Sequence, residues 1–137
     1  MSPTFAEAVE TLELLPEWEQ RYTYVIELAK HLPAMAEAEK TEESRVRGCT
    51  AQVWLTHSWQ GAGEGATLHL NLDADALIVR GLLALIWLAY HGQTRASVHQ
   101  QNVANSLLKS GLMQHLSPNR RNGFASVEAR IHQLASV

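Results

Sequence analysis

Cys49 is the one cysteine of the chain and the side chain best suited to act as a nucleophile. It follows Gly48, which permits the backbone of a tight loop tip, and it comes shortly after Arg45 and Arg47. Nearby arginines favour the thiolate, which is the reactive form. The alternative is a buried cysteine that acts as a small hydrophobic residue, a common placement for this side chain. Residue type and spacing leave both interpretations open.

The other polar residues show weaker patterns. The seven histidines lack the spacings typical of metal ligands, and none is singled out as a partner for Cys49, so a cysteine-dependent hydrolase is only an alternative. Asp73 and Asp75 could form a carboxylate pair, but an apolar helix follows at once and favours a capping role. The glycines of segment 61–65 are not followed by Gly-Lys-Ser/Thr, so they indicate a hairpin turn and not a phosphate-binding loop.

Composition limits the class of protein. The 137 residues are 46% hydrophobic, which predicts a single domain over residues 1–137 with a real core. A net charge of −3 argues against a nucleic-acid surface, and one cysteine excludes an internal disulfide. The N-terminus lacks the pattern of a signal peptide, and the longest apolar stretch (76–90) is short for a membrane span. We therefore expect a cytoplasmic protein that contacts neither membrane nor nucleic acid.

The elements that must position Cys49 can be predicted from periodicity. Apolar residues recur at helical spacing in segments 5–15 and 18–32, and a polar connector follows over 37–44. Segments 53–56 and 67–72 have strand patterns on either side of the glycine-rich turn, and a third short strand is predicted over 44–47.

The second half of the chain has mainly helical patterns. Segment 76–90 is apolar almost all round and predicts a buried helix, with shorter helices over 94–101 and 105–110. Ser117-Pro118 predicts the start of a last helix that carries Phe124, Val127, Ile131 and Leu134 as its apolar stripe. Helices, a small sheet and further helices in that order predict an α+β fold.

Five segments, taken together and in order, resemble the SufE/CsdE family of sulfur-acceptor proteins. They are segments 18–22, 28–33, 46–55, 73–84 and 116–124. The most specific blocks are Gly-Cys followed by Val-Trp at 48–54, Ile-Val-Arg-Gly-Leu at 78–82 and Leu-Ser-Pro with Arg at 116–120. Ala74 replaces the serine of the family's Ser-Asp-Ala motif, and Thr50-Ala51 replaces the usual pair after the cysteine. These departures leave the Suf and Csd branches both open.

The resemblance implies a fold and an activity. The fold is α+β, a three-stranded antiparallel sheet covered by helices, similar to the scaffold protein IscU. The implied activity is to accept persulfide sulfur from a PLP-dependent cysteine desulfurase of the SufS or CsdA type and to stimulate that enzyme. The sulfur then passes to iron–sulfur cluster assembly, through SufBCD or another recipient. The chain needs no cofactor, since PLP belongs to the desulfurase, and it acts as a sulfur-carrying activator more than as a stand-alone enzyme.

The resemblance also assigns roles to residues. Cys49 corresponds to the essential cysteine, Arg120 to an arginine near the cysteine loop, and Asp75 to the aspartate of the Ser-Asp-Ala motif. We expect Gly48 to allow loop motion, Gln52 and Trp54 to support the loop, and Asp75 and Arg47 to face the desulfurase. The resting thiol is expected in an apolar pocket. The main alternative is an adaptor that binds a desulfurase or scaffold without carrying sulfur.

Overall fold

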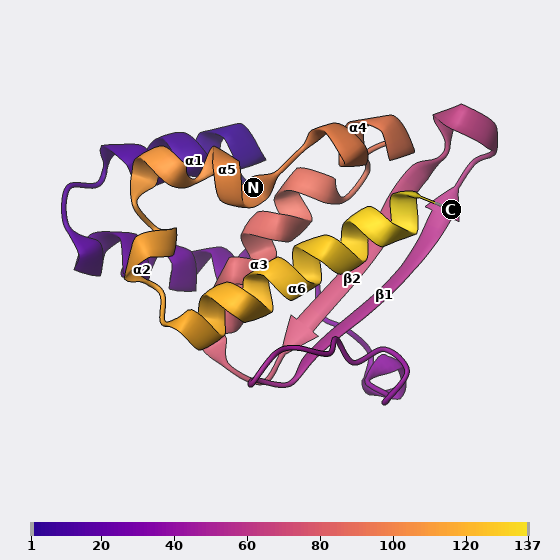
Figure 1. The fold of residues 1–137 in the computed structure, drawn as a ribbon, viewed down its shortest axis with the longest axis horizontal. Helices are drawn as coiled ribbons and strands as arrows, with labels where there is room; N and C mark the ends of the chain where they lie inside the picture. Colours follow the sequence, from indigo (N-terminus) through magenta and orange to yellow (C-terminus); the bar gives the residue numbers. More distant parts are fainter. Residues whose placement is uncertain (1, 137) are drawn as a thin grey trace.

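The computed structural model describes residues 2–136, and over this range the chain forms six α-helices and a two-stranded antiparallel sheet (Figure 1). The α+β class predicted from the sequence is confirmed. In chain order the elements are α1 (Phe5–Leu14), α2 (Trp18–Leu28), β1 (Val53–Gln60), β2 (Thr67–Ala74), α3 (Leu77–Tyr90), α4 (Arg95–Gln100), α5 (Val103–Ser106) and α6 (Pro118–Ala135).

The two strands form the predicted hairpin. They pair without interruption from Val53↔Ala74 to Gln60↔Thr67, and the glycine-rich segment between them makes the turn. Gly61 and Gly63 in this turn have φ values of +89° and +65°, which glycine adopts readily.

The expectation of a three-stranded sheet is wrong, because the described residues form only two strands. The segment 44–47 makes one isolated bridge, Arg45↔Trp54, instead of a strand. Two backbone hydrogen bonds define it, from Val46 N to Val53 O at 2.8 Å and from Leu55 N to Ser44 O at 2.8 Å. The ladder stops there because Gly48 turns the chain away from the sheet with a φ of +89°.

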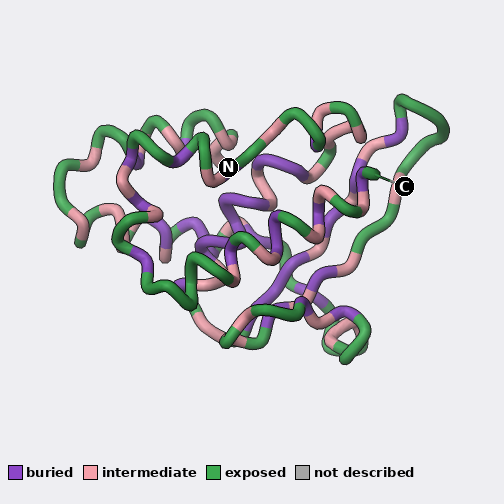
Figure 2. The backbone as a smooth tube through the Cα atoms, viewed as in Figure 1, coloured by how far each residue is buried: buried purple, intermediate pink, exposed green. Residues whose placement is uncertain are grey.

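Helix α3 is the centre of the core, as its apolar sequence predicts. It packs against β2 on one side and against α2 on the other, and most of its residues are buried (Figure 2). Gly81 makes the contact with α2 possible, since a Cβ atom there would lie 2.1 Å from the carbonyl oxygen of Val25. The glycine inside this apolar run is thus required for close approach of two helices.

Side chains from the end of α3 cover the outer edge of β2. Trp87 Nε1 donates to Leu70 O at 2.7 Å, and the Leu70 N–H donates to His91 Nδ1 at 3.1 Å. The ring of His91 also stacks on Trp87, with centroids 4.3 Å apart. These contacts satisfy the backbone N–H and C=O of Leu70, which a further strand would otherwise use.

Helix α6 runs diagonally across the front of the molecule in Figure 1, and its start is the one predicted. Ser117 accepts the N–H of Arg120 at 3.2 Å, and Pro118 occupies the first turn. Further along, the buried carboxylate of Glu128 accepts Tyr90 OH and Val103 N–H, each at 2.5 Å. This one side chain ties α6 to α3 and to the start of α5.

None of the helices within residues 2–136 combines the length and the apolar character that crossing a membrane requires.

Candidate functional site

The loop that carries Cys49 is fixed at both ends. The Val46–Val53 hydrogen bond closes it at its base. Next to that bond, Asp75 makes two contacts with Gln52: its Oδ1 accepts the Gln52 N–H at 3.2 Å, and its own N–H donates to Gln52 O at 3.2 Å. The segment from Arg47 to Gln52 is therefore a short loop on a rigid base.

Gly48 sets the direction of this loop. Its φ of +89° lies in the left-handed region, which other residues adopt at a cost. A Cβ atom on Gly48 would also lie only 2.5 Å from Ser126 Oγ on α6. The backbone of the loop thus lies against the helix, and the side chain of Cys49 is directed inward.

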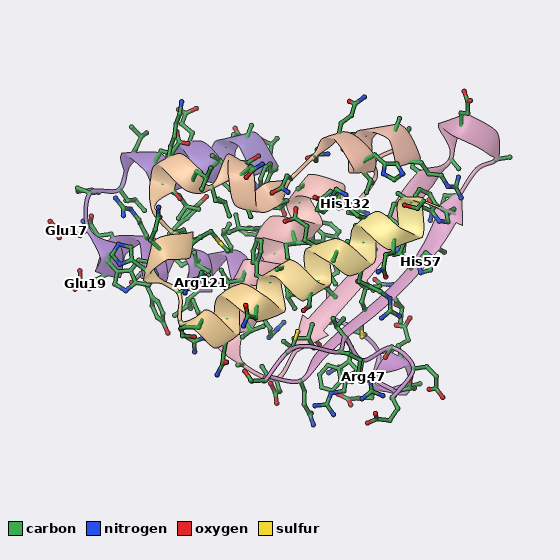
Figure 3. The ribbon with its side chains drawn as sticks, in the orientation of Figure 1. Glu17, Glu19, Arg47, His57, Arg121 and His132 are labelled. Atoms are coloured by element: carbon green, nitrogen blue, oxygen red, sulfur yellow. The ribbon has the colours of Figure 1, made fainter. Side chains whose placement is uncertain are left out.

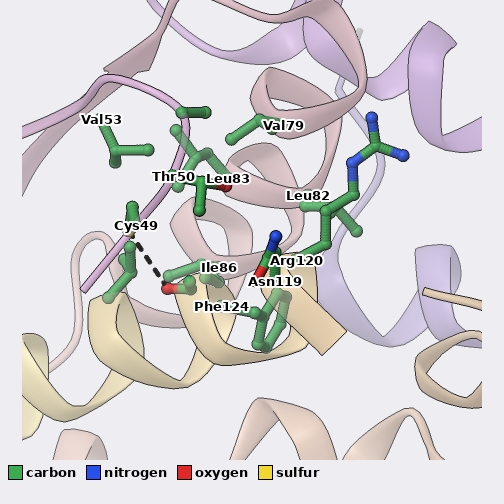
Figure 4. Close-up of a pocket in the computed structure, with 13 residues that line it drawn as sticks. Cys49, Thr50, Val53, Val79, Leu82, Leu83, Ile86, Asn119, Arg120 and Phe124 are labelled. Atoms are coloured by element: carbon green, nitrogen blue, oxygen red, sulfur yellow. Dashed lines mark hydrogen bonds between the residues drawn. The ribbon is translucent and has the colours of Figure 1, made fainter. Parts of the chain in front are cut away.

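The thiol of Cys49 lines an apolar pocket between the loop, α3 and α6 (Figure 4). The cavity is small, about 30 Å³. The Cys49 sulfur lies 3.6 Å from the carbonyl oxygen of Gly123, and its S–H donates to that oxygen. The wall is formed mainly by hydrocarbon side chains, namely Ala51, Val53, Val79, Leu82, Leu83, Ile86, Phe124 and Val127.

Burial raises the pKa of the Cys49 thiol above its ordinary value of 9.0, and the positive charge of Arg45 opposes this shift without cancelling it. Arg45 therefore lowers the pKa of the thiol, as predicted, but its effect is smaller than that of burial. Desolvation has the larger effect because the thiol is half-buried among hydrocarbon groups. At neutral pH the resting side chain is a neutral thiol.

Arg120 reaches the rim of the pocket, whereas Arg47 does not line it. Arg120 lies in the first turn of α6, and its guanidinium is at the edge of the cavity, away from the thiol (Figure 4). Arg47 is exposed on the outside of the loop (Figure 3). Its Nη2 lies 3.5 Å from Glu42 Oε2. Arg47 thus belongs to the Cys49 loop itself, whereas Arg120 lies on α6 at the edge of the pocket.

Trp54 lies outside the pocket, on the other face of the hairpin. Its ring lies under Lys40 Nζ, 5.4 Å from the ring centroid, and it is paired with Asp73 across the strands. Gln52 is exposed and contributes its backbone, not its side chain, to the support of the loop. Both residues thus act from the base of the loop and not from the cavity.

The capping role favoured for Asp73 and Asp75 is wrong. The N-cap of α3 is Ala76, without a side-chain hydrogen bond. Asp73 is buried and lies 3.1 Å from Lys40 Nζ and 3.1 Å from Arg80 Nε, although the Nε–H is not aligned for a hydrogen bond. The Asp73 carboxylate also accepts the N–H of its neighbour Ala74 at 2.8 Å, and the Asp75 carboxylate accepts that of Gln52.

Sequence reasoning did not single out Gly123 and Ser126, which contact the cysteine loop from α6. Their contacts join residues more than 70 positions apart, so spacing gives no indication of them. One signal was present: glycine in the interior of a helix is unfavourable, and its presence there often has a packing or functional reason.

No histidine is among the residues that line the Cys49 pocket in the described part of the chain. Within residues 2–136 there is likewise no group of three or more His, Cys, Asp or Glu side chains placed to hold a metal ion. Over the described residues, the site therefore offers a thiol in a hydrocarbon pocket that no histidine lines.

Comparison with known proteins places this site in context. Residues 6–135 match the family model "SufE: Fe-S metabolism associated domain". An uncharacterized SufE-like protein of Rhizobium etli is 39% identical over 129 residues, 94% of this chain and 87% of the relative. One of Rhizobium meliloti is 40% identical over 123 residues, 90% of this chain and 88% of the relative.

A solved structure shows the same fold. It is the solution structure of a hypothetical protein from Thermus thermophilus, which aligns with a TM-score of 0.75 at 21% identity and covers 99% of this chain and 96% of its own. At that identity the likeness concerns the fold alone.

Proposed function

Because this chain belongs to the SufE family and so has a role in iron–sulfur metabolism, we propose that it accepts sulfur on Cys49 from a PLP-dependent cysteine desulfurase. It stimulates that enzyme and passes the sulfur on to cluster assembly, through SufBCD or another recipient. The observation that carries the proposal is the placement of Cys49 on a short loop, with its thiol in a hydrocarbon pocket.

The reaction is a thiol–persulfide exchange. The Cys49 thiolate attacks the outer sulfur of the desulfurase persulfide, a new S–S bond forms on Cys49, and the S–S bond of the enzyme breaks. Cys49–SH and enzyme–S–SH thus become Cys49–S–SH and enzyme–SH, with no net change in protons or electrons. The chain supplies the nucleophile and the loop, and the desulfurase supplies PLP and the sulfur.

The protonation state of the resting thiol supports an acceptor that reacts only with its partner. A neutral thiol is a poor nucleophile, and a half-buried one is poorly accessible to oxidants. The loop has to leave the hydrocarbon pocket before Cys49 meets the partner's persulfide. Once the loop has moved outward, the thiol has left the hydrocarbon pocket whose desolvation raises its pKa, so it ionises more easily there.

The surrounding residues have separate roles in this proposal. In this proposal Arg120, at the rim of the pocket, meets the thiolate or persulfide anion once the loop has moved outward. Arg47 at the start of the loop and Asp75 beside its end are both exposed, and they form part of the face offered to the desulfurase. Gly48 permits the loop backbone, and Gln52 with Trp54 holds its base.

Intact mass spectrometry tests the proposal directly. The protein is incubated with a cysteine desulfurase and L-cysteine without reductant, beside the variant Cys49→Ser. We expect the wild-type chain to gain one or more sulfur atoms that reductant removes, and the variant to gain none. Stimulation of desulfurase turnover is measured in the same reactions.

The outcome distinguishes a carrier from an adaptor. A carrier loses its stimulation of the desulfurase in Cys49→Ser. If the variant stimulates turnover as well as the wild type does, and no sulfur appears on the wild-type chain, the protein is an adaptor and the proposal is wrong.

A further inference from the structure

Gly123 is in direct contact with Cys49. It lies in α6, and its carbonyl oxygen accepts the Cys49 S–H at 3.6 Å. A Cβ atom on Gly123 would have the Sγ, Cβ and Cα atoms of Cys49 as its nearest neighbours, at 3.4, 3.7 and 3.8 Å. Gly123 also lines the pocket, so a side chain there would project into the cavity beside the sulfur.

These distances predict that a methyl group on residue 123 affects the thiol and the persulfide of Cys49 differently. A contact of 3.4 Å is ordinary van der Waals distance, so the resting thiol would tolerate a methyl group on residue 123. An outer sulfur bonded to Sγ adds an atom about 2.0 Å away, which has to fit in the same cavity of about 30 Å³. A methyl group at 3.4 Å from Sγ takes part of that space.

The remaining walls offer little alternative room. Val53, Leu83 and Phe124 are buried side chains that also pack in the core, so they cannot move aside without disturbing it. The loop itself is held at its base by Val46 and Gln52. An outer sulfur that does not fit therefore displaces the loop tip outward.

We infer that Gly123 is a positioning residue for the persulfide form: its missing side chain leaves the space in which the outer sulfur on Cys49 is sheltered from solvent. The inference rests on the proposed function, since it concerns the sulfur that Cys49 would carry. The absence of a side chain at Gly123 thus matters when Cys49 carries a persulfide and not when it is a free thiol.

The test compares Gly123→Ala with the wild-type chain after chemical loading, without a desulfurase. Inorganic polysulfide supplies the sulfur: one of its S–S bonds breaks, a sulfane sulfur is bonded to Sγ, and a shorter polysulfide leaves. After removal of the excess, cyanide takes the outer sulfur as thiocyanate and restores the Cys49 thiolate. The rate of thiocyanate release reports how often the outer sulfur is exposed.

We expect the outer sulfur to be lost about tenfold faster from Gly123→Ala, since overpacking of a filled site changes such equilibria by an order of magnitude. The unloaded variant should react with iodoacetamide within about twofold of the wild-type rate, since the methyl group fits beside the thiol. Alanine does not weaken the interior of a helix, so the variant should fold. Gly65→Ala, where a Cβ atom would meet nothing within 4 Å, is the matched control and should match the wild type.

Three results would overturn the inference. The first is that Gly123→Ala and the wild type release thiocyanate at the same rate. The second is that the variant reacts faster with iodoacetamide and with cyanide by the same factor. The third is that the wild-type chain retains no sulfur after polysulfide treatment. Failure of the desulfurase to load Cys49 contradicts the proposed function and leaves this test unaffected, because polysulfide loads the thiol independently.

Discussion

Asp75 and Gln52 are joined by two reciprocal hydrogen bonds. The Asp75 carboxylate accepts the N–H of Gln52, and the N–H of Asp75 donates to the carbonyl oxygen of Gln52, each at 3.2 Å. The two residues are 23 positions apart and belong to different segments, the end of the cysteine loop and the link between β2 and α3. An exposed carboxylate thus fixes the loop that carries the nucleophile.

Replacing Asp75 by alanine should loosen the cysteine loop without unfolding the protein. One of the two hydrogen bonds is lost, which should lower the free energy of unfolding by about 1 kcal/mol. We expect alkylation of Cys49 by iodoacetamide to become several-fold faster, because the loop tip leaves the pocket more often. Asp75→Asn keeps an acceptor oxygen and is the control; equal alkylation rates in the alanine variant and the wild type would contradict this role.

Replacing Gly48 by alanine should destabilise the loop for two separable reasons. The left-handed backbone costs an alanine about 1–2 kcal/mol, and the new methyl group overlaps Ser126 Oγ at 2.5 Å. In the double variant with Ser126→Ala, part of the loss should be recovered and the backbone part should remain. Urea unfolding of Gly48→Ala, Ser126→Ala and the double variant checks this, and a Gly48→Ala protein as stable as the wild type would refute it.

The reactivity of Cys49 should require a higher pH in the folded chain than in the unfolded one. Burial raises the pKa of its thiol above 9.0, so the thiolate fraction at pH 9 is below one half. We expect the midpoint of the alkylation rate against pH to lie higher in buffer than in urea. Arg45→Gln removes the charge that opposes the shift and should raise the midpoint further. A folded-state midpoint at or below the unfolded one is the result that this explanation does not allow.

Stability should fall at high pH through Tyr90. Burial, followed by the neighbouring Glu128 carboxylate, raises the pKa of the Tyr90 hydroxyl well above 10 in the folded chain. Above pH 10 the unfolded chain has lost this proton and the folded chain retains it. The contribution of Tyr90 to the free energy of unfolding is therefore complete below pH 10, and it declines above pH 10 by about 1.4 kcal/mol per pH unit. Denaturant titrations at pH 8–11 should show this slope, and Tyr90→Phe should flatten it; an identical slope in that variant would exclude Tyr90 as its cause.

The parts of the fold that sequence predicts are those set by local chemistry. Periodicity located the hairpin and the buried helix α3, and Ser117-Pro118 located the start of α6. Such signals depend on neighbours within a few residues, which the sequence displays directly.

The errors arise where contacts or turns outside a segment decide its structure. Asp73 has the pattern of a helix cap but is held by Lys40 and Arg80, and the segment 44–47 has the pattern of a strand but makes one bridge. At the site, the prediction that the Cys49 thiol lies in an apolar pocket agrees with the structure, whereas the contact with Gly123 had no local signal beyond a glycine inside a helix.

The short cysteine loop has a consequence for the shape of any sulfur donor. Its base is closed by the bond between Val46 and Val53, so only the residues from Arg47 to Gln52 are free to extend. Half of that segment, at ~3.4 Å per extended residue, spans roughly 10 Å. The Cys49 thiol therefore cannot reach far from the surface of the protein. The donor has to bring its own sulfur to the surface of this protein, which requires two closely fitting bodies and makes sulfur delivery depend on the shape of the docked pair.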